Sequence, residues 1–347
     1  MADDFVLACP APLPGDETIK LAHGGGGRAT ERLLETIFRP VFADPELDAR
    51  HDGARLAAGA TVAFTTDSYV VRPLIFPGGD IGSLAVHGTV NDIAVSGGRP
   101  RWLSLALILE EGLPLDLLRR ILDSAAAAAA ACGVTIATGD TKVVARGQCD
   151  RLYINTAGLG DPLLGFRLAP ASIRPNDVVL VSGTLGDHGM AVLCARQGIG
   201  IRNGPSSDSA PVHRLVAALA PVAPQVRFLR DPTRGGVAAV TNEIVEGRPI
   251  GIRLREEALP FAPGTRAAAE LLGLDLLDVA CEGRVLAVVA ADAADAALAA
   301  WRALPEGAQA VRIGEVDAHR GQVTLETLMG GHRLVDVPQG EVLPRIC

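Results

Sequence analysis

Apolar residues follow two repeating patterns along the chain, and together they predict helices and strands that alternate from about residue 29 onward. Apolar residues three or four positions apart are typical of helices that bury one face, and short continuous apolar runs are typical of buried strands. In the first half these patterns predict strands over 60–71, 101–111, 134–144 and 151–160, and helices over 29–42, 83–98 and 115–133. Glycines close the helix over 83–98, as they commonly do just past a helix end.

The second half repeats this alternation, which predicts a second unit of the same α/β class. Strands are predicted over 176–183, 251–259, 282–290 and 322–327, and helices over 187–198, 210–223, 234–247 and 291–304. A stretch rich in Pro and Gly near 160–172 is the expected link. We therefore predict an N-terminal extension (1–22), a first domain (23–165), a second domain (166–330) and a tail (331–347).

The predicted tail has no helical pattern and finishes on a cysteine, Cys347. Fully extended, it would reach roughly 55 Å, at about 3.3 Å per residue. It could therefore enter a site on its own chain or on a neighbouring chain. Cysteine gains little from packing at such a position, so Cys347 is either incidental or the carrier of a chemical group.

Composition narrows the class of protein. A chain of 347 residues with 48% hydrophobic and 21% charged residues is typical of a globular enzyme with two domains. The net charge of −8 argues against nucleic-acid and anionic-membrane partners, and no apolar run of 18 residues predicts a membrane span. Six cysteines without a C-x-x-C pair, together with an acidic start unlike a signal peptide, predict reduced thiols in a cytoplasmic protein.

Four aspartates stand beside small residues or directly after apolar runs: Asp67 in TTDSYVV, Asp92 in NDIAVSGG, Asp140 in TGDTKVV and Asp231 in RDPTRGG. In α/β folds, ligand sites lie at the ends of strands, and converging carboxylates suit Mg²⁺ with its phosphates. A single aspartate of this kind is more often a turn former or a helix cap, so the prediction depends on all four together.

Three further features could serve the same site. The run HGGGGR (23–28) is either a linker or a loop that closes over phosphates, with Arg28 adding charge; no G-K-[ST] follows, so it is not a Walker motif. Lys142 is either a phosphate contact or a solvated lysine. Glu282 either pairs with Arg284 or faces a nucleotide.

Taken together, TTDSYVV, HGTVNDIAVSGGRP, TGDTKVV, RDPTRGGVAAVTNEI and the final PRIC closely resemble the HypE family of hydrogenase maturation factors. That family belongs to the PurM-like ATP-binding superfamily of aminoimidazole ribonucleotide synthetase and selenophosphate synthetase. The resemblance runs from about Ile19 to Cys347. It implies a two-domain α/β (α+β) PurM-like fold, a homodimer in which first-domain strands of two chains form a shared β-barrel, and a flexible tail.

The resemblance also implies an activity and its residues. The final cysteine would receive a carbamoyl group from a HypF-type carbamoyltransferase and be dehydrated, with ATP, to a thiocyanate. The cyano group would then pass to iron on a HypC–HypD complex, as a ligand of the [NiFe] hydrogenase centre. The implied catalytic residues are Cys347, Lys142 and Glu282. The implied ATP-binding residues are Asp67, Asp92, Asp140, Thr141, Asn91, Gly25, Gly26, Arg28 and Arg234. The implied Mg²⁺ ligands are Asp67, Asp92, Asp140 and Asp231.

Two other functions stay open on the sequence alone. Another PurM-like ATP enzyme, such as a small-molecule kinase or a synthetase, would not need Cys347. A non-catalytic thiol carrier or scaffold would not need the four aspartates.

Overall fold

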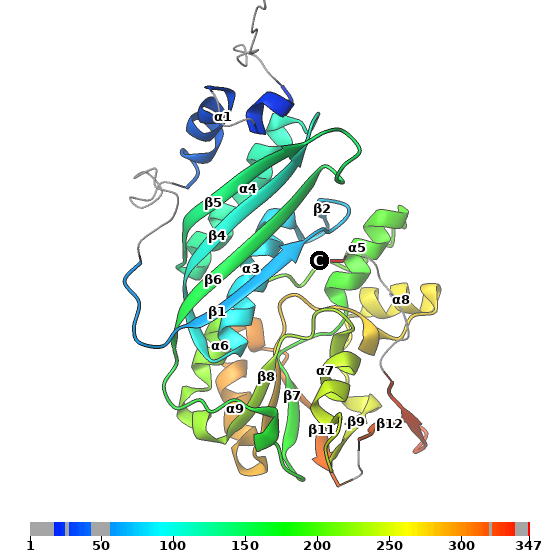
Figure 1. Cartoon of the computed structure of the whole chain (residues 1–347). Helices are drawn as coiled ribbons and strands as arrows, with labels where there is room; N and C mark the ends of the chain where they lie inside the picture. Colours follow the sequence, from blue (N-terminus) through cyan, green and yellow to red (C-terminus); the bar gives the residue numbers. More distant parts are fainter. Residues whose placement is uncertain (1–16, 25–27, 43–55, 319–320, 337–345) are drawn as a thin grey trace, which may run out of the picture.

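A computed structural model describes residues 17–24, 28–42, 56–318, 321–336 and 346–347 (Figure 1). The first half is built on a four-stranded sheet with the order β1 (Ala63–Tyr69), β6 (Leu152–Pro162), β4 (Gly98–Glu110) and β5 (Thr135–Val144). The pair β4–β5 is parallel and the other two pairs are antiparallel. Two helices, α3 (Ile81–Val95) and α4 (Leu115–Cys132), belong to this half.

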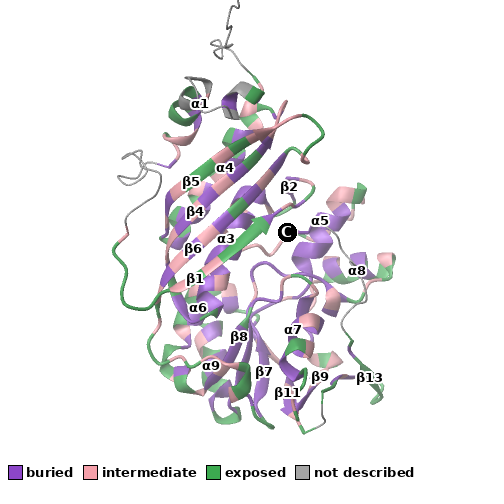
Figure 2. Ribbon diagram, viewed as in Figure 1, coloured by how far each residue is buried: buried purple, intermediate pink, exposed green. Residues whose placement is uncertain are grey.

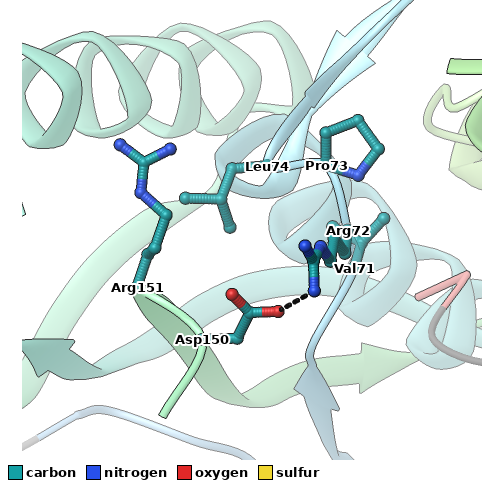
Figure 3. Close-up of a pocket in the computed structure, with 6 residues that line it drawn as sticks. All are labelled: Val71, Arg72, Pro73, Leu74, Asp150 and Arg151. Atoms are coloured by element: carbon teal, nitrogen blue, oxygen red, sulfur yellow. Dashed lines mark hydrogen bonds and ion pairs between the residues drawn. The ribbon is translucent and has the colours of Figure 1, made fainter. Parts of the chain in front are cut away.

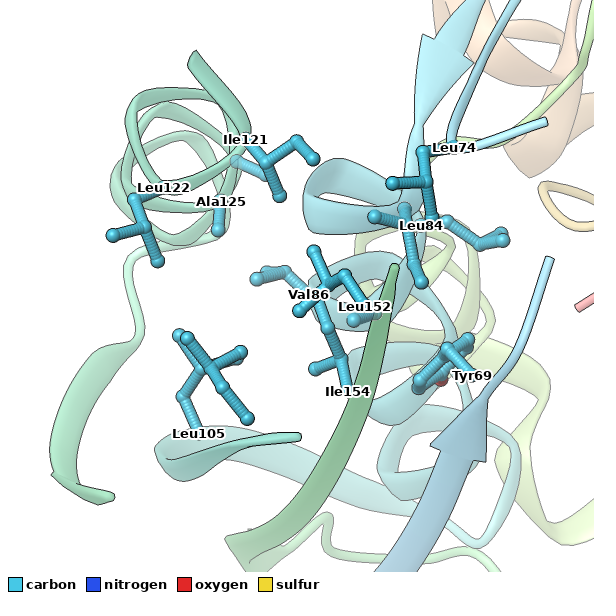
Figure 4. Close-up of a cluster of buried hydrophobic side chains, with 14 of the residues drawn as sticks. Tyr69, Leu74, Leu84, Val86, Leu105, Ile121, Leu122, Ala125, Leu152 and Ile154 are labelled. Atoms are coloured by element: carbon cyan, nitrogen blue, oxygen red, sulfur yellow. The ribbon is translucent and has the colours of Figure 1, made fainter. Parts of the chain in front are cut away.

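The two faces of this sheet differ in polarity because side chains alternate along each strand. On β4, Leu103, Leu105, Leu107 and Leu109 are buried in one cluster with side chains of α3 and α4 (Figure 4). The intervening Ser104, Ala106 and Ile108 face away from the helices and are only partly covered (Figure 2). Helices therefore cover one face of the sheet and leave the other open.

Local chemistry explains where the two helices begin and end. Asp80 caps α3 by accepting hydrogen bonds from the N–H groups of Gly82 and Ser83, at 2.8 and 3.0 Å. Gly82 also permits close packing of the helices, because a Cβ there would lie 2.2 Å from the Ile121 carbonyl oxygen of α4. Helix α4 ends at Gly133, whose φ of +66° is left-handed.

The second half is built on a seven-stranded mixed sheet. The strand order is β13 (His332–Leu334), β12 (Val323–Glu326), β9 (Gly251–Arg255), β11 (Val311–Asp317), β7 (Val178–Val181), β10 (Leu286–Val289) and β8 (Val226–Arg230). Its helices are α5 (Asp187–Gln197), α6 (His213–Ala218), α7 (Gly236–Val245), α8 (Pro263–Leu272) and α9 (Ala294–Arg302). Both faces are buried: Val179 and Val181 pack in the cluster that includes α7, and Val178 and Leu180 pack in the cluster that includes α6 and α9.

Short elements complete the fold. The strands β2 (Ile75–Phe76) and β3 (Gly79–Asp80) form a small hairpin, and α1 (Arg28–Leu33) continues into a π-helical stretch, Leu34–Phe38. No helix in the described ranges is long and apolar enough to cross a membrane.

The two-domain mixed α/β architecture is confirmed, although several elements differ from the predictions. The sequence patterns missed β8, β11 and α8, and the helix predicted over 210–223 is the short α6 followed by the 3₁₀ segment Ala220–Gln225. Pro221 and Pro224 explain the change, because proline cannot donate a helical hydrogen bond. Part of the predicted tail, His332–Leu334, is the edge strand of the second sheet. The domain limits themselves remain predictions.

Acid is expected to weaken the contact between the halves, where His87 of α3 lies 3.1 Å from the Ser209 hydroxyl. Burial, assisted by His213, lowers the pKa of His87 to about 4. Between about pH 6.5 and 4, His87 is therefore protonated in the unfolded chain and neutral in the folded protein. The stabilisation that this pKa difference provides is fully present above about pH 6.5. It is lost as the pH falls toward 4, which lowers the free energy of unfolding by about 2–3 kcal/mol. Denaturant unfolding at stepped pH should show a flatter dependence for His87→Gln; identical pH curves for the two proteins would refute this.

Candidate active site

The last two residues of the chain lie between the two halves of the molecule, next to α5 and to the segment that follows β1 (Figure 1). The Ile346 carbonyl oxygen is 2.9 Å from His188 Nε2, and the main-chain oxygen of Cys347 accepts a hydrogen bond from the Val70 N–H at 3.1 Å. The Ile346 side chain is 5% exposed and belongs to the buried core of the first half. The Arg234 guanidinium donates to Cys347 Sγ at 3.8 Å.

Four acidic side chains from four separate segments form one cluster in which their charges act on one another, and two of them, Glu282 and Asp67, also act on the Cys347 thiol. Asp67 lies on β1 and Asp92 on α3, Asp231 directly follows β8, and Glu282 precedes β10. The prediction that these aspartates lie at the ends of strands therefore holds for Asp231 alone, since Asp67 is inside its strand and Asp92 is on a helix. Thr65 donates to Asp92 Oδ2 at 2.9 Å.

The electrostatics of these carboxyls show negative charge that Arg230 only partly compensates. Burial, assisted by the charge of Asp92, raises the pKa of Asp231 to about 7. Burial, with the charges of Asp231 and other acids, raises the pKa of Glu282 well above its usual value. Among the described residues, Glu282 Oε1 has no hydrogen-bond partner. A buried polar atom without a partner calls for a ligand, an ion or water.

The backbone around Glu282 explains why its side chain is held in this place. The Glu282 N–H donates to Asp208 Oδ1 at 3.1 Å, and Arg284 pairs with Asp208 instead of Glu282. Gly283 is required here, because a Cβ would lie 1.9 Å from the Asp208 carbonyl oxygen. The Cys281 N–H donates to the Pro232 carbonyl at 2.9 Å, which brings the Glu282 and Asp231 segments together.

The thiol of Cys347 is held in its neutral form in this position. Burial and the negative charge of Glu282 raise the pKa of the Cys347 thiol to about 12, and Arg234 only partly opposes them. Thiolate is the nucleophilic form of cysteine, so the docked sulfur is a poor nucleophile at neutral pH.

Two predicted residues, Asp140 and Lys142, lie away from this cluster within one chain. They pair with each other at 3.1 Å on β5, at the opposite edge of the four-stranded sheet from β1. Asp140 pairs with Ala106 and Lys142 pairs with Ile108, so both side chains point to the open face of the sheet. Asp67 pairs with Thr156, which in turn pairs with Leu105, so Asp67 is on the face that the helices cover. Three strand spacings of about 4.8 Å separate the two edges by about 14 Å.

The other predicted residues vary in their placement. Asn91 is fully buried, and its amide links the halves by hydrogen bonds to main-chain atoms of Ala210, Glu282 and Val212. Thr141 lies beside Lys142 on β5, and Arg28 begins α1. Gly25 and Gly26 lie outside the described residues. Sequence reasoning missed His188; a histidine in the first turn of a helix, just before its apolar run MAVLC, was the available signal.

A pocket of about 170 Å³ is formed by the segment that directly follows Val70 and by the start of the β6 region. It is lined by Val71, Arg72, Pro73, Leu74, Asp150 and Arg151 (Figure 3). An ion pair at 3.4 Å joins Arg72 to Asp150. Arg196 of α5 donates to the Arg72 carbonyl at 2.9 Å, which ties this segment to the second half. The pocket contains none of the predicted site residues.

Comparisons with known proteins match this chain and its fold. Residues 50–161 match the family described as AIR synthase related protein, N-terminal domain, and residues 174–326 match its C-terminal domain. The fold and site thus define a two-domain protein of the AIR synthase related class. Carbamoyl dehydratase HypE of Rhodobacter capsulatus is 50% identical over 336 residues, which cover 96% of this chain and 99% of that protein. This chain belongs to the HypE family of carbamoyl dehydratases, and the resemblance seen in its sequence motifs is confirmed.

Solved structures show the same relation. The crystal structure of hydrogenase maturation protein HypE in complex with ATP has a TM-score of 0.90 and 45% identity, covering 94% of this chain and 99% of that one. The crystal structure of a HypE–HypF complex has a TM-score of 0.78 and 43% identity, covering 88% and 99%.

Proposed function

We propose that this protein is an ATP-dependent carbamoyl dehydratase that converts an S-carbamoyl group on Cys347 into a thiocyanate, which supplies cyanide ligands for [NiFe] hydrogenase. The observation that carries the proposal is the position of Cys347 Sγ beside Arg234, where the charge of Glu282 acts on the thiol. Glu282 is buried, and its Oε1 has no hydrogen-bond partner among the described residues. The names of the relatives support the same activity.

The chemistry requires activation of the amide oxygen, which is a poor leaving group. Transfer of the γ-phosphoryl group of ATP to that oxygen, with release of one of the two N–H protons, gives an O-phosphorylated intermediate with a C=N–H bond and ADP. Loss of the remaining N–H proton and of inorganic phosphate then leaves C≡N on sulfur. Glu282 is the proposed acceptor of that proton, because a carboxylate with a raised pKa is a stronger base once it is ionised.

Nucleotide and Mg²⁺ would be held by the acidic cluster. No three acidic, histidine or cysteine side chains in the described ranges are close enough to hold a metal by themselves. Mg²⁺ commonly takes one or two carboxylates and completes its shell with substrate phosphates and water. Asp67, Asp92 and Asp231 fit that role: burial and the charge of Asp67 raise the pKa of Asp92, and burial and the charge of Asp92 raise the pKa of Asp231. The ion would neutralise charge on the transferring phosphoryl group.

The tail must also leave this site. The docked thiol is neutral at ordinary pH and thus unsuited to attack an activated carbamoyl group. Loading by a HypF-type carbamoyltransferase would take place with Cys347 away from the cluster, and transfer of cyanide to iron on a HypC–HypD complex would require a second departure. The HypE–HypF complex structure supports the first of these partners.

Asp140, Thr141 and Lys142 would join the site from a second copy of the chain. The open face of the four-stranded sheet suits a homodimer in which two such sheets close into a barrel, as do its edge strands β1 and β5, which pair with no further strand in the described ranges. Closure of that kind brings β5 of one copy near β1 of the other. Lys142 would then meet the phosphoryl group or the carbamoyl oxygen from across the interface.

Intact-mass measurement tests the proposed reaction. Incubation with carbamoyl phosphate, ATP and the carbamoyltransferase should add one carbamoyl group and then remove one water, and the second step should require ATP. Cys347→Ala should abolish both mass changes and leave Mg-ATP binding intact. Full turnover of a soluble substrate by Cys347→Ala would favour a metabolite kinase, and failure to bind Mg-ATP at millimolar concentration would favour a scaffold.

A further inference from the structure

We propose that His188 is a positioning residue that sets the register of residues 346–347, so that the group carried on Cys347 faces Glu282 and Arg234. The inference rests on the proposed function, because it gives His188 a role in the dehydration step. It arises from a side chain that the sequence motifs did not single out.

Hydrogen bonds determine which nitrogen of His188 carries the proton. The Ile346 carbonyl oxygen can only accept, so the ring proton must lie on the nitrogen that faces it. Ser207 Oγ, which accepts from the Ser209 N–H at 3.1 Å, can donate its own hydrogen to His188 Nδ1 at 2.8 Å. The Nδ1 atom is then an acceptor, and the single proton of the neutral ring lies on Nε2. That N–H donates to the Ile346 carbonyl oxygen at 2.9 Å.

The ring itself has little freedom to choose another arrangement. His188 is 0% exposed, and the ring of Phe76 packs against it at a right angle, with 5.4 Å between ring centroids. Burial lowers the pKa of His188 to about 4, so the imidazole is neutral at physiological pH and has one proton to donate. Ser207 is anchored in turn by its N–H, which donates to the Pro77 carbonyl at 2.8 Å.

Two main-chain contacts then fix the last residue on both sides. His188 holds the carbonyl of Ile346, and the Val70 N–H holds the main-chain oxygen of Cys347. The Ile346 side chain is buried, so a slip by one residue would move it out of the core and turn the sulfur away from Arg234. A single neutral hydrogen bond is modest in strength, which suits a tail that must dock and depart.

Three substitutions separate a positioning role from a packing role. In His188→Gln the amide N–H₂ takes the place of Nε2–H and can reach the Ile346 carbonyl. In His188→Asn the shorter amide can keep the Ser207 contact and cannot reach Ile346. His188→Phe keeps the ring volume and loses both contacts. His87→Gln is the matched control, because His87 also forms a hydrogen bond with a serine of the same loop, Ser209, and forms none with residues 346–347, the part of the tail that the structure describes.

The experiment measures three rates for each variant by mass spectrometry. These are carbamoylation of Cys347 by the carbamoyltransferase, ATP-dependent loss of water from the carbamoylated protein, and alkylation of unmodified Cys347 by iodoacetamide. For His188→Asn and His188→Phe we expect water loss to slow by about three- to tenfold, alkylation to speed up by a similar factor, and carbamoylation to stay unchanged. His188→Gln should approach the parent in all three rates, as should His87→Gln.

Other outcomes would overturn the proposal. Rescue by asparagine and not by glutamine would mean that His188 only supports the Ser207 loop. Parental alkylation rates in all three variants would mean that it does not hold the tail. If the parent protein itself lost no water, the proposed function would fail, while the alkylation rates would still decide whether His188 positions the tail.

Discussion

Glu282→Gln is expected to slow the ATP-dependent loss of water from carbamoylated Cys347 by about 10²- to 10⁴-fold, with carbamoylation unchanged. The amide has the same shape as the carboxyl and cannot accept a proton, so the variant removes the proposed base alone. Single-turnover mass spectrometry of the carbamoylated protein measures the rate. Folding should survive, because the carboxyl is buried without a partner for Oε1 among the described residues, and a neutral amide avoids the cost of burying charge.

Glu270→Gln is the control for this prediction. Glu270 is exposed on α8, outside the cluster around Cys347, and its replacement should leave the rate of water loss at the parental value. If Glu282→Gln lost water as fast as the parent, another group would be the base.

Mixing two inactive variants, Cys347→Ala and Lys142→Ala, is expected to restore about half of the parental activity. Each variant alone should be inactive or slowed by at least about 10²-fold, because the first lacks the carrier and the second lacks a charge on the transferring phosphate. In a mixed dimer, the intact Cys347 of one copy would meet the intact Lys142 of the other, so one of the two sites would be complete. Co-expression with two affinity tags, purification through both, and measurement of water loss would test this.

The same experiment can contradict the arrangement. If Lys142 served the cysteine of its own chain, neither site of the mixed dimer would be complete and no activity would return. A mixture of Cys347→Ala with Glu282→Ala is the matched control: both residues lie in one cluster of one chain, so this mixed dimer should regain no activity, provided that the tail docks in its own chain.

Elements with strong local signals were predicted well. The strand β4, with its apolar run, and the alanine-rich helix α4, closed by Gly133, were predicted to within a few residues of their observed bounds. Burial on one face and a left-handed cap are local properties, so nearby residues are enough to predict them. The strand β8 was missed because Arg227 and Arg230 interrupt its short apolar run, and β8 owes its place to pairing with β10. Pairing between distant segments has no local signal.

The site was predicted unevenly for the same reason. The sequence motifs named Cys347, Arg234, Asp67, Asp92, Asp231 and Glu282. The structure gathers the four acids into one cluster, Arg234 donates to the Cys347 sulfur, and the charges of Glu282 and Asp67 act on the thiol. Asn91 was named as a nucleotide contact. In the structure its side chain forms hydrogen bonds with main-chain atoms of the second half and so joins the two halves. His188 carried no motif, because its role depends on Ser207 and Ile346, which are distant in the sequence.

The amino-acid sequence by itself determined the two α/β units, the family and the types of side chain available for the chemistry, because apolar spacing and short motifs lie within a few consecutive residues. Only the tertiary structure decided which of those side chains meet. Strand order puts β1 and β5 on opposite edges of one sheet, and the alternation of side chains turns Asp67 and Lys142 to opposite faces. Alternation is local to each strand, but strand order and pairing register arise from hydrogen bonds between distant strands, which local sequence does not encode.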